Sequence, residues 1–233
     1  MTDSASSPQL ITWQTLGRAA LQALLDEAGA PLHLEDCDLE GGDFSRLDLR
    51  GCHFTRCAIM EASFAGAALG DTHWISCRGR QADFKAADVT DSVFEKCDLN
   101  NTNWRRAKLG ASSFTHCKLT GAHLEDAATL GLTFADTLLI GAFLQGMSFR
   151  KCLLQGLDFS DADLVGADFR EAVFIGGSLR NANLQDCRFD GTDLREVDLG
   201  GLKLIDARPF RGATISSAQA AMLLHELGLT VLD

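Results

Sequence analysis

Three histidines have a spacing that could support metal chemistry. His33, His53 and His73 recur at intervals of 20 residues, and imidazole is a common zinc ligand. In a repetitive chain this spacing would stack the three rings on one face. Ladders of identical side chains are more frequent in such chains than metal sites, so we favour a ladder and keep zinc as the alternative.

The eight cysteines are the second group of reactive side chains. They share one place in a five-residue period, two residues before an apolar residue. They are Cys37, Cys52, Cys57, Cys77, Cys97, Cys117, Cys152 and Cys187. The sequence has no C-x-x-C pair typical of zinc sites. Stacked cysteines would fall within the Cα range of about 4.4–6.8 Å for a disulfide, but a buried slot in a cytoplasmic protein favours free thiols.

Catalytic patterns are absent from the sequence. It has no nucleophile paired with a base, no glycine-rich phosphate loop after a strand and no convergent carboxylates. We therefore expect a protein without enzymatic activity, cofactor or metal.

A period of five residues dominates the chain and must position all of these groups. An apolar residue stands at every fifth position from Leu34 to Leu204, with Gly79 and Thr129 as the exceptions. This period matches neither an α-helix nor a simple strand. Small residues usually lie two positions earlier, and five cysteines repeat at intervals of 20, which indicates four repeats per coil.

In this pattern the chain resembles the pentapeptide-repeat family, whose motif A(D/N)Lxx is seen in the run A-D-L-V-G-A-D-F-R at 162–170. The resemblance implies an all-β fold, a right-handed quadrilateral β-helix of about nine coils, with the apolar and small residues pointing inward. A filled interior of this kind offers no active-site pocket.

The ends of the repeat are expected to be covered by helices. We expect residues 1–31 to form a disordered tail and a capping helix from Thr12 to about Ala28. The β-helix should span 32–215, with a register slip of one residue after Leu204. A second helix should begin at Ser216 or Ser217 within a capping segment at 216–233.

The C-terminal segment resembles that of the Qnr-type quinolone-resistance proteins. The matching residues are Gln219, Ala220, Leu223, Leu227, Gly228 and Val231. The resemblance implies a two-fold dimer joined at the C-termini, which binds DNA gyrase and topoisomerase IV as a mimic of DNA. The expected dimer contacts are Met222, Leu223, Leu227, Leu229 and Val231; the alternative is a simple hydrophobic end cap.

The charge of the chain fits a protein partner better than nucleic acid. The net charge of −11 opposes direct contact with phosphates. Acidic residues near the C-terminal end are candidates for a partner-binding surface: Asp158, Asp161, Asp163, Asp168, Glu171, Asp190, Asp193 and Asp198. The alternative for each aspartate before an apolar residue is a local turn hydrogen bond. Residues 78–118, by contrast, form a basic band.

Four apolar residues at outward positions offer a different surface. They are Leu130, Leu138, Ile140 and Phe143, and exposed apolar clusters often mark partner sites. The sequence shows no apolar run of about 18 residues that could span a membrane, and we expect a cytoplasmic location. Two functions remain open: protection of topoisomerase from a drug or a toxin, and an adaptor that joins other proteins.

Overall fold

The computed structural model describes residues 9–202, 208–226 and 228–231. The chain divides into two compact units. The first comprises residues 1–117 and 126–133, and the second comprises residues 118–125 and 134–233.

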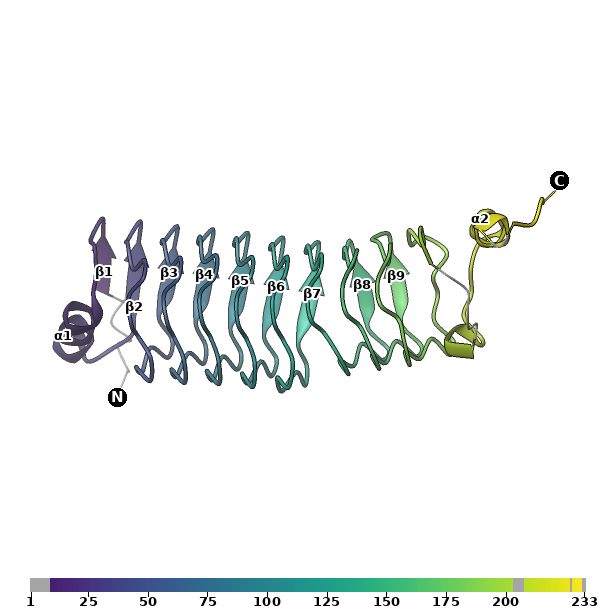
Figure 1. Ribbon diagram of the computed structural model, residues 1–233. Coiled ribbons are helices and arrows are strands. Elements are labelled where there is room, and N and C mark those ends of the chain that lie inside the picture. The colour runs from purple at the N-terminus through teal and green to yellow at the C-terminus, as the bar shows by residue number, and fades with distance from the viewer. Residues whose placement is uncertain (1–8, 203–207, 227, 232–233) are drawn as a thin grey trace, which may run out of the picture. The chain divides into compact units, whose positions relative to one another are not determined.

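The first unit contains six parallel strands and one helix. The strands are β1 (Gln9–Thr12), β2 (Leu32–Glu35), β3 (His53–Thr55), β4 (His73–Ile75), β5 (Val93–Glu95) and β6 (Ser113–Thr115), and helix α1 spans Arg18–Ala28. Each strand pairs in parallel with the next one along the chain. Figure 1 shows these strands stacked in chain order, with α1 beside β1.

The second unit continues the same architecture. Strand β7 (Thr133–Ala135) pairs through Ala135 with β8 (Leu153–Gln155), and β8 pairs with β9 (Val173–Ile175). A short 3₁₀ helix, η1 (Arg208–Phe210), and helix α2 (Ser217–Glu226) follow the described part of the repeat.

Each coil has four faces, because four segments of a coil each pair with the equivalent segment of the next coil. Face 1 carries the strands. Faces 2, 3 and 4 are centred on Asp38, Asp43 and Asp48, which pair with Ala58, Ser63 and Ala68, and on the residues that continue these three ladders along the chain. A two-residue corner ends each face. This is the quadrilateral β-helix that the five-residue period predicts.

The interior is filled by the two inward positions of each repeat, as expected. Central residues such as Leu34, Phe64 and Leu164 have no exposed surface. Aromatic rings stack on the ring of the next coil; the centroids of Phe54 and Trp74 lie 3.8 Å apart and those of Phe169 and Phe189 4.9 Å apart. Continuous ladders of this kind bury apolar area without gaps between coils.

The N-terminal segment differs from the expectation. Residues 9–12 form strand β1, and helix α1 begins at Arg18 after Gly17, so Thr12 does not cap it. Buried Ile11, Leu16 and Leu21 follow a period of five whose phase differs from that of the main repeat. Ile11 pairs with Leu34 across a longer stretch of chain than one regular coil, because α1 is inserted between the two strands. The described part of the β-helix therefore begins before residue 32. Residues 1–8, where we expected a tail, lie outside the described part.

The C-terminal end confirms the expected change of register. Asp193 pairs with Thr214, 21 residues later, whereas Asp163 pairs with Asn183, 20 residues later. The ring of Phe189 stacks on that of Phe210 at 4.8 Å. Helix α2 begins at Ser217, as expected, and ends at Glu226.

A buried polar cluster supports the aromatic ladder of the first unit. The indole N–H of Trp74 donates to Thr72 Oγ1 at 2.9 Å, and the Thr72 and Ser92 hydroxyls are hydrogen-bonded at 2.9 Å. Both hydroxyls also lie within hydrogen-bond distance of the Leu69 carbonyl oxygen, at 2.8 and 2.7 Å, so their two hydrogens are shared among three contacts. All three side chains are fully buried, so each hydrogen bond replaces one that water would otherwise supply.

We expect Thr72→Val to lower the free energy of unfolding by about 1–3 kcal/mol, because it leaves the indole N–H of Trp74 buried without an acceptor. Urea denaturation followed by circular dichroism measures the change. Ser112→Ala is the matched control. The Ser112 hydroxyl donates to the Val89 carbonyl, and after the substitution this carbonyl still accepts a hydrogen bond from the backbone N–H of Ser92. The control should cost at most about 1 kcal/mol, and equal effects of the two substitutions would contradict this role of Thr72.

Candidate functional site

The candidate acidic residues are distributed over all four faces of the second unit. Asp158 and Asp198 lie on face 2, with Asp161 at the corner that ends it. Asp163 lies on face 3 and Asp193 on face 1. Asp168, Glu171 and Asp190 belong to face 4 and its corner. Two groups of neighbours result: Asp158, Asp161 and Asp198 on face 2, and Asp168, Glu171 and Asp190 on face 4. The eight acids do not form a single acidic stripe.

Most of these aspartates stabilise turns. Oδ1 of the residue before the apolar position accepts a hydrogen bond from the backbone N–H two residues later. This holds for Asp158, Asp163, Asp168, Asp193 and Asp198. The turn interpretation is confirmed for these five, and a role in partner binding would be additional to it.

Four of the eight acids are also neutralised by ion pairs. Asp168 contacts Arg170 at 2.5 Å, Asp193 contacts Arg195 at 2.6 Å, and Asp198 contacts Arg180 at 2.7 Å. Glu171 contacts Arg150 at 2.9 Å. Hydrogen bonds from these arginines lower the pKa of Asp168, Asp193 and Glu171; the pKa of Asp198 is lowered by the Gly200 N–H and then by Arg180. In the described part of the chain, Asp158, Asp161, Asp163 and Asp190 have no ion pair.

The histidine ladder forms as expected. The ring centroids of His33 and His53 lie 5.8 Å apart and those of His53 and His73 4.5 Å apart. Burial, and then the two neighbouring imidazoles, lower the pKa of His53. Among the residues that the structure describes, no three His, Cys, Asp or Glu side chains are placed to hold a metal.

The cysteines are free thiols, and all except the half-buried Cys152 are buried. Their Sγ atoms contact backbone carbonyls, as Cys57 does with Leu34 at 3.4 Å. Burial raises the pKa of Cys52, and raises that of Cys187 to about 12. Such thiols are poor nucleophiles and act as small hydrophobic side chains.

Helix α2 is tied to the last coils through its inner side. Ser216 and Gln219 cap the helix reciprocally, with the Ser216 N–H donating to Gln219 Oε1 at 2.7 Å. The same Gln219 side chain donates through Nε2 to the carbonyls of Leu194 and Val197, both at 2.7 Å. Leu223 is 6% exposed, so it packs within the protomer.

The outer side of α2, taken here with the segment that follows the helix, is apolar and exposed. Leu224, which the sequence interpretation omitted, is 38% exposed, Leu229 53% and Val231 47%. Half-buried Met222 lines a shallow hollow of about 570 Å³ together with Val231. Leu227 lies outside the described residues. Of the expected dimer contacts, Leu223 therefore packs inward, whereas Leu229 and Val231 lie on the outer apolar surface.

The expected apolar cluster is less exposed than its positions suggested. In the first unit, Leu130 is 91% exposed. In the second, Leu138 is 36% exposed, Ile140 and Phe143 are half-buried, and the Phe143 ring stacks on His123 at 4.3 Å.

A second apolar surface was missed from the sequence. Leu153 of β8 lies beside Val173 of β9, and Ile175 follows at the corner. Their side chains are 59%, 42% and 44% exposed. Placing each residue in the repeat would have identified them, because outward positions are otherwise mostly polar.

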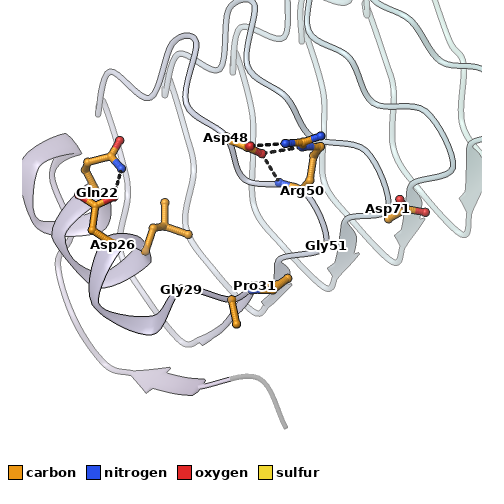
Figure 2. Close-up of a pocket in the computed structure, with 10 residues that line it drawn as sticks. Gln22, Asp26, Gly29, Pro31, Asp48, Arg50, Gly51 and Asp71 are labelled. Atoms are coloured by element: carbon orange, nitrogen blue, oxygen red, sulfur yellow. Dashed lines mark hydrogen bonds and ion pairs between the residues drawn. The ribbon is translucent and has the colours of Figure 1, made fainter. Parts of the chain in front are cut away.

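A hollow of about 590 Å³ lies between α1 and face 4 of the first unit (Figure 2). Four of its polar side chains pair with one another. The Arg50 guanidinium donates through Nε and Nη2 to Asp48, and Gln22 Nε2 donates to Asp26 at 2.8 Å. Asp71 also lines the hollow. None of the helices in the described ranges is long and apolar enough to cross a membrane.

Comparisons with known proteins agree with this geometry. The profile "Pentapeptide repeat region" matches residues 32–104, and "Pentapeptide repeats (8 copies)" matches 90–126, 134–170 and 174–208. No curated protein sequence matches the chain.

Solved structures of QnrB1, a plasmid-mediated fluoroquinolone resistance protein, are similar. A trypsin-treated form is 25% identical, with a TM-score of 0.74, over 86% of this chain and 99% of that one. The full-length form is 19% identical, with a TM-score of 0.60, over 95% of this chain and 98% of that one; this second likeness concerns the fold. The repeat, the four-faced coils and these profiles together show that the chain belongs to the pentapeptide-repeat family.

Proposed function

We propose that this protein is a non-catalytic binding protein that acts on type II topoisomerase, DNA gyrase in particular, as a partial mimic of DNA. The observation that carries the proposal is the likeness to QnrB1 over nearly the whole of that chain. The protein would protect the enzyme from a quinolone-type drug or from a toxin.

The charge distribution supports electrostatic recognition of moderate strength. The chain has a net charge of −11, and Asp158, Asp161, Asp163 and Asp190 have no ion pair in the part of the second unit that the structure describes. Of the other four acids, Glu171 and Asp198 form exposed ion pairs, which contribute little stability. A basic partner surface could therefore replace their arginines at low cost, and binding should weaken with salt.

The outer side of α2 supports a dimer joined at the C-termini. Leu224, Leu229 and Val231 are exposed although they belong to the end of a well-packed protomer. A two-fold contact would remove this apolar surface from water. It would also bring two copies of the acidic second unit together.

An adaptor function is the second candidate. The exposed group formed by Leu153, Val173 and Ile175 favours it, because contiguous apolar side chains on a sheet face are typical of protein-binding surfaces.

Purified protein titrated into a gyrase supercoiling assay, with and without ciprofloxacin, tests the first proposal. We expect inhibition of supercoiling or relief of drug inhibition at about micromolar protein or below. Joint substitution Asp161→Asn and Asp190→Asn should weaken the effect several-fold, because it removes two unpaired charges. Asp91→Asn in the first unit is the control: Asp91 and Asp161 are both exposed and share a left-handed backbone, with φ of 60° and 57°. No effect of the wild type at tens of micromolar would exclude the topoisomerase function.

Cysteine substitution tests the C-terminal dimer separately. Leu229→Cys or Val231→Cys places an accessible thiol in the exposed segment that follows α2, and mild oxidation should give a disulfide-linked dimer on a non-reducing gel. Leu10→Cys is the control, because Leu10 is also 53% exposed but lies in β1. Monomers from both C-terminal variants, or equal dimer from the control, would argue against the two-fold contact.

A further inference from the structure

Face 2 of the first unit carries exposed acidic and basic side chains in different coils. Asp38 and Glu40 lie in one coil, and Arg78 and Arg80 lie two coils later on the same face. At about 4.8 Å per coil the opposite charges are about 10 Å apart along the face. None of these four side chains has an ion pair with the described residues, so all four depend on water or on a partner.

The surface between these charges is hollow and apolar. Ala58, 8% exposed, and half-buried Met60 occupy the middle coil. They line a depression of about 380 Å³ that Asp38 and Arg78 border on opposite sides. Trp13 stands at the edge of this depression with 79% of its surface exposed, whereas Trp74 and Trp104 are fully buried.

We propose that this face binds the same face of a second copy of the chain, with a two-fold axis passing close to Ala58. A half-turn about an axis that lies in the plane of the contact, parallel to the strands of the face, brings the two faces together and reverses the order of the coils. It therefore places Asp38 of each copy opposite Arg78 of the other. A two-fold contact requires such self-complementarity, because each pairing occurs twice.

The corner residues obey the same symmetry. The rotation sets each corner of face 2 against the same corner of the other copy, so Glu40 comes to lie opposite Arg80. The middle coil lies on the axis and sets Arg56 and Glu61 each against its equivalent, and Asp36 already neutralises Arg56 within the protomer at 2.7 Å. A parallel alignment of two copies would instead set Arg78 against Arg78.

Trp13 adds an apolar component at the margin of the contact. Trp13 follows β1, in the coil before the one that contains Asp38. Its backbone N–H donates to the backbone carbonyl of Glu35 at 3.2 Å. The two-fold rotation places it over the coil that contains Asp98 of the other copy. An exposed tryptophan covered by a partner is a frequent source of binding energy.

Charge exchange between equivalent positions gives a direct test. Arg78 and Asp38 occupy the same place in their repeats, so Arg78→Asp and Asp38→Arg each introduce a residue that this position already accepts elsewhere. Both are made in a Leu229→Asp background, which removes association through α2. Sedimentation equilibrium is measured up to about 100 µM, so that a weak contact is also detected. Quenching of Trp13 fluorescence by acrylamide is the second readout.

The background protein should be a dimer whose association weakens with salt, and each single reversal should be a monomer with Trp13 more accessible. An equimolar mixture of the two reversals should form a dimer again, because the arginine introduced into one variant would then oppose the aspartate introduced into the other. Lys85→Asp, at a corner between faces 3 and 4, should leave the dimer intact. A monomeric background protein, or a mixture that fails to associate, would overturn the proposal; neither result depends on gyrase binding.

Discussion

Every coil of this protein depends on the hydrogen bonds that its backbone makes with the coils before and after it. The ladder is parallel and recurs once per coil on each face, as when Leu39 N–H donates to the Ala58 carbonyl at 2.8 Å. Side chains can then reach the interior only at two positions of each repeat, which explains the apolar ladders and the buried cysteine slot. The ladder must also end somewhere, and α1 and α2 cover the first and last described coils with the buried side chains of Leu21 and Leu223.

The same constraint separates what the sequence can predict from what it cannot. The interior is periodic, so the four-faced fold, the buried slot, the register slip at Thr214 and the start of α2 were all predictable. Strand β1 was not, because the insertion of α1 shifts the phase of Ile11 relative to Leu34. Because of that shift, Trp13 lies at an exposed corner and not in the helix that we expected.

Binding sites on the exterior are harder to predict because they depend on which side chains pair with one another. Asp168 and Asp190 are equally acidic in the sequence, but Arg170 neutralises the first and leaves the second without an ion pair in the described chain. Leu223 and Leu224 are neighbours in the sequence, but one packs inward and the other faces solvent. The proposed partner contacts therefore rest on the charges without an ion pair and on the apolar residues that the protomer leaves exposed, in each unit by itself.

Competition with DNA is the most direct test of the central claim, that the exterior occupies the DNA-binding surface of a type II topoisomerase. Fluorescence anisotropy of a labelled duplex bound to gyrase can be followed as this protein is added. We expect the anisotropy to fall as the duplex is displaced, and to fall less at higher salt. Unchanged anisotropy at tens of micromolar protein, with the enzyme still bound to DNA, would contradict the claim.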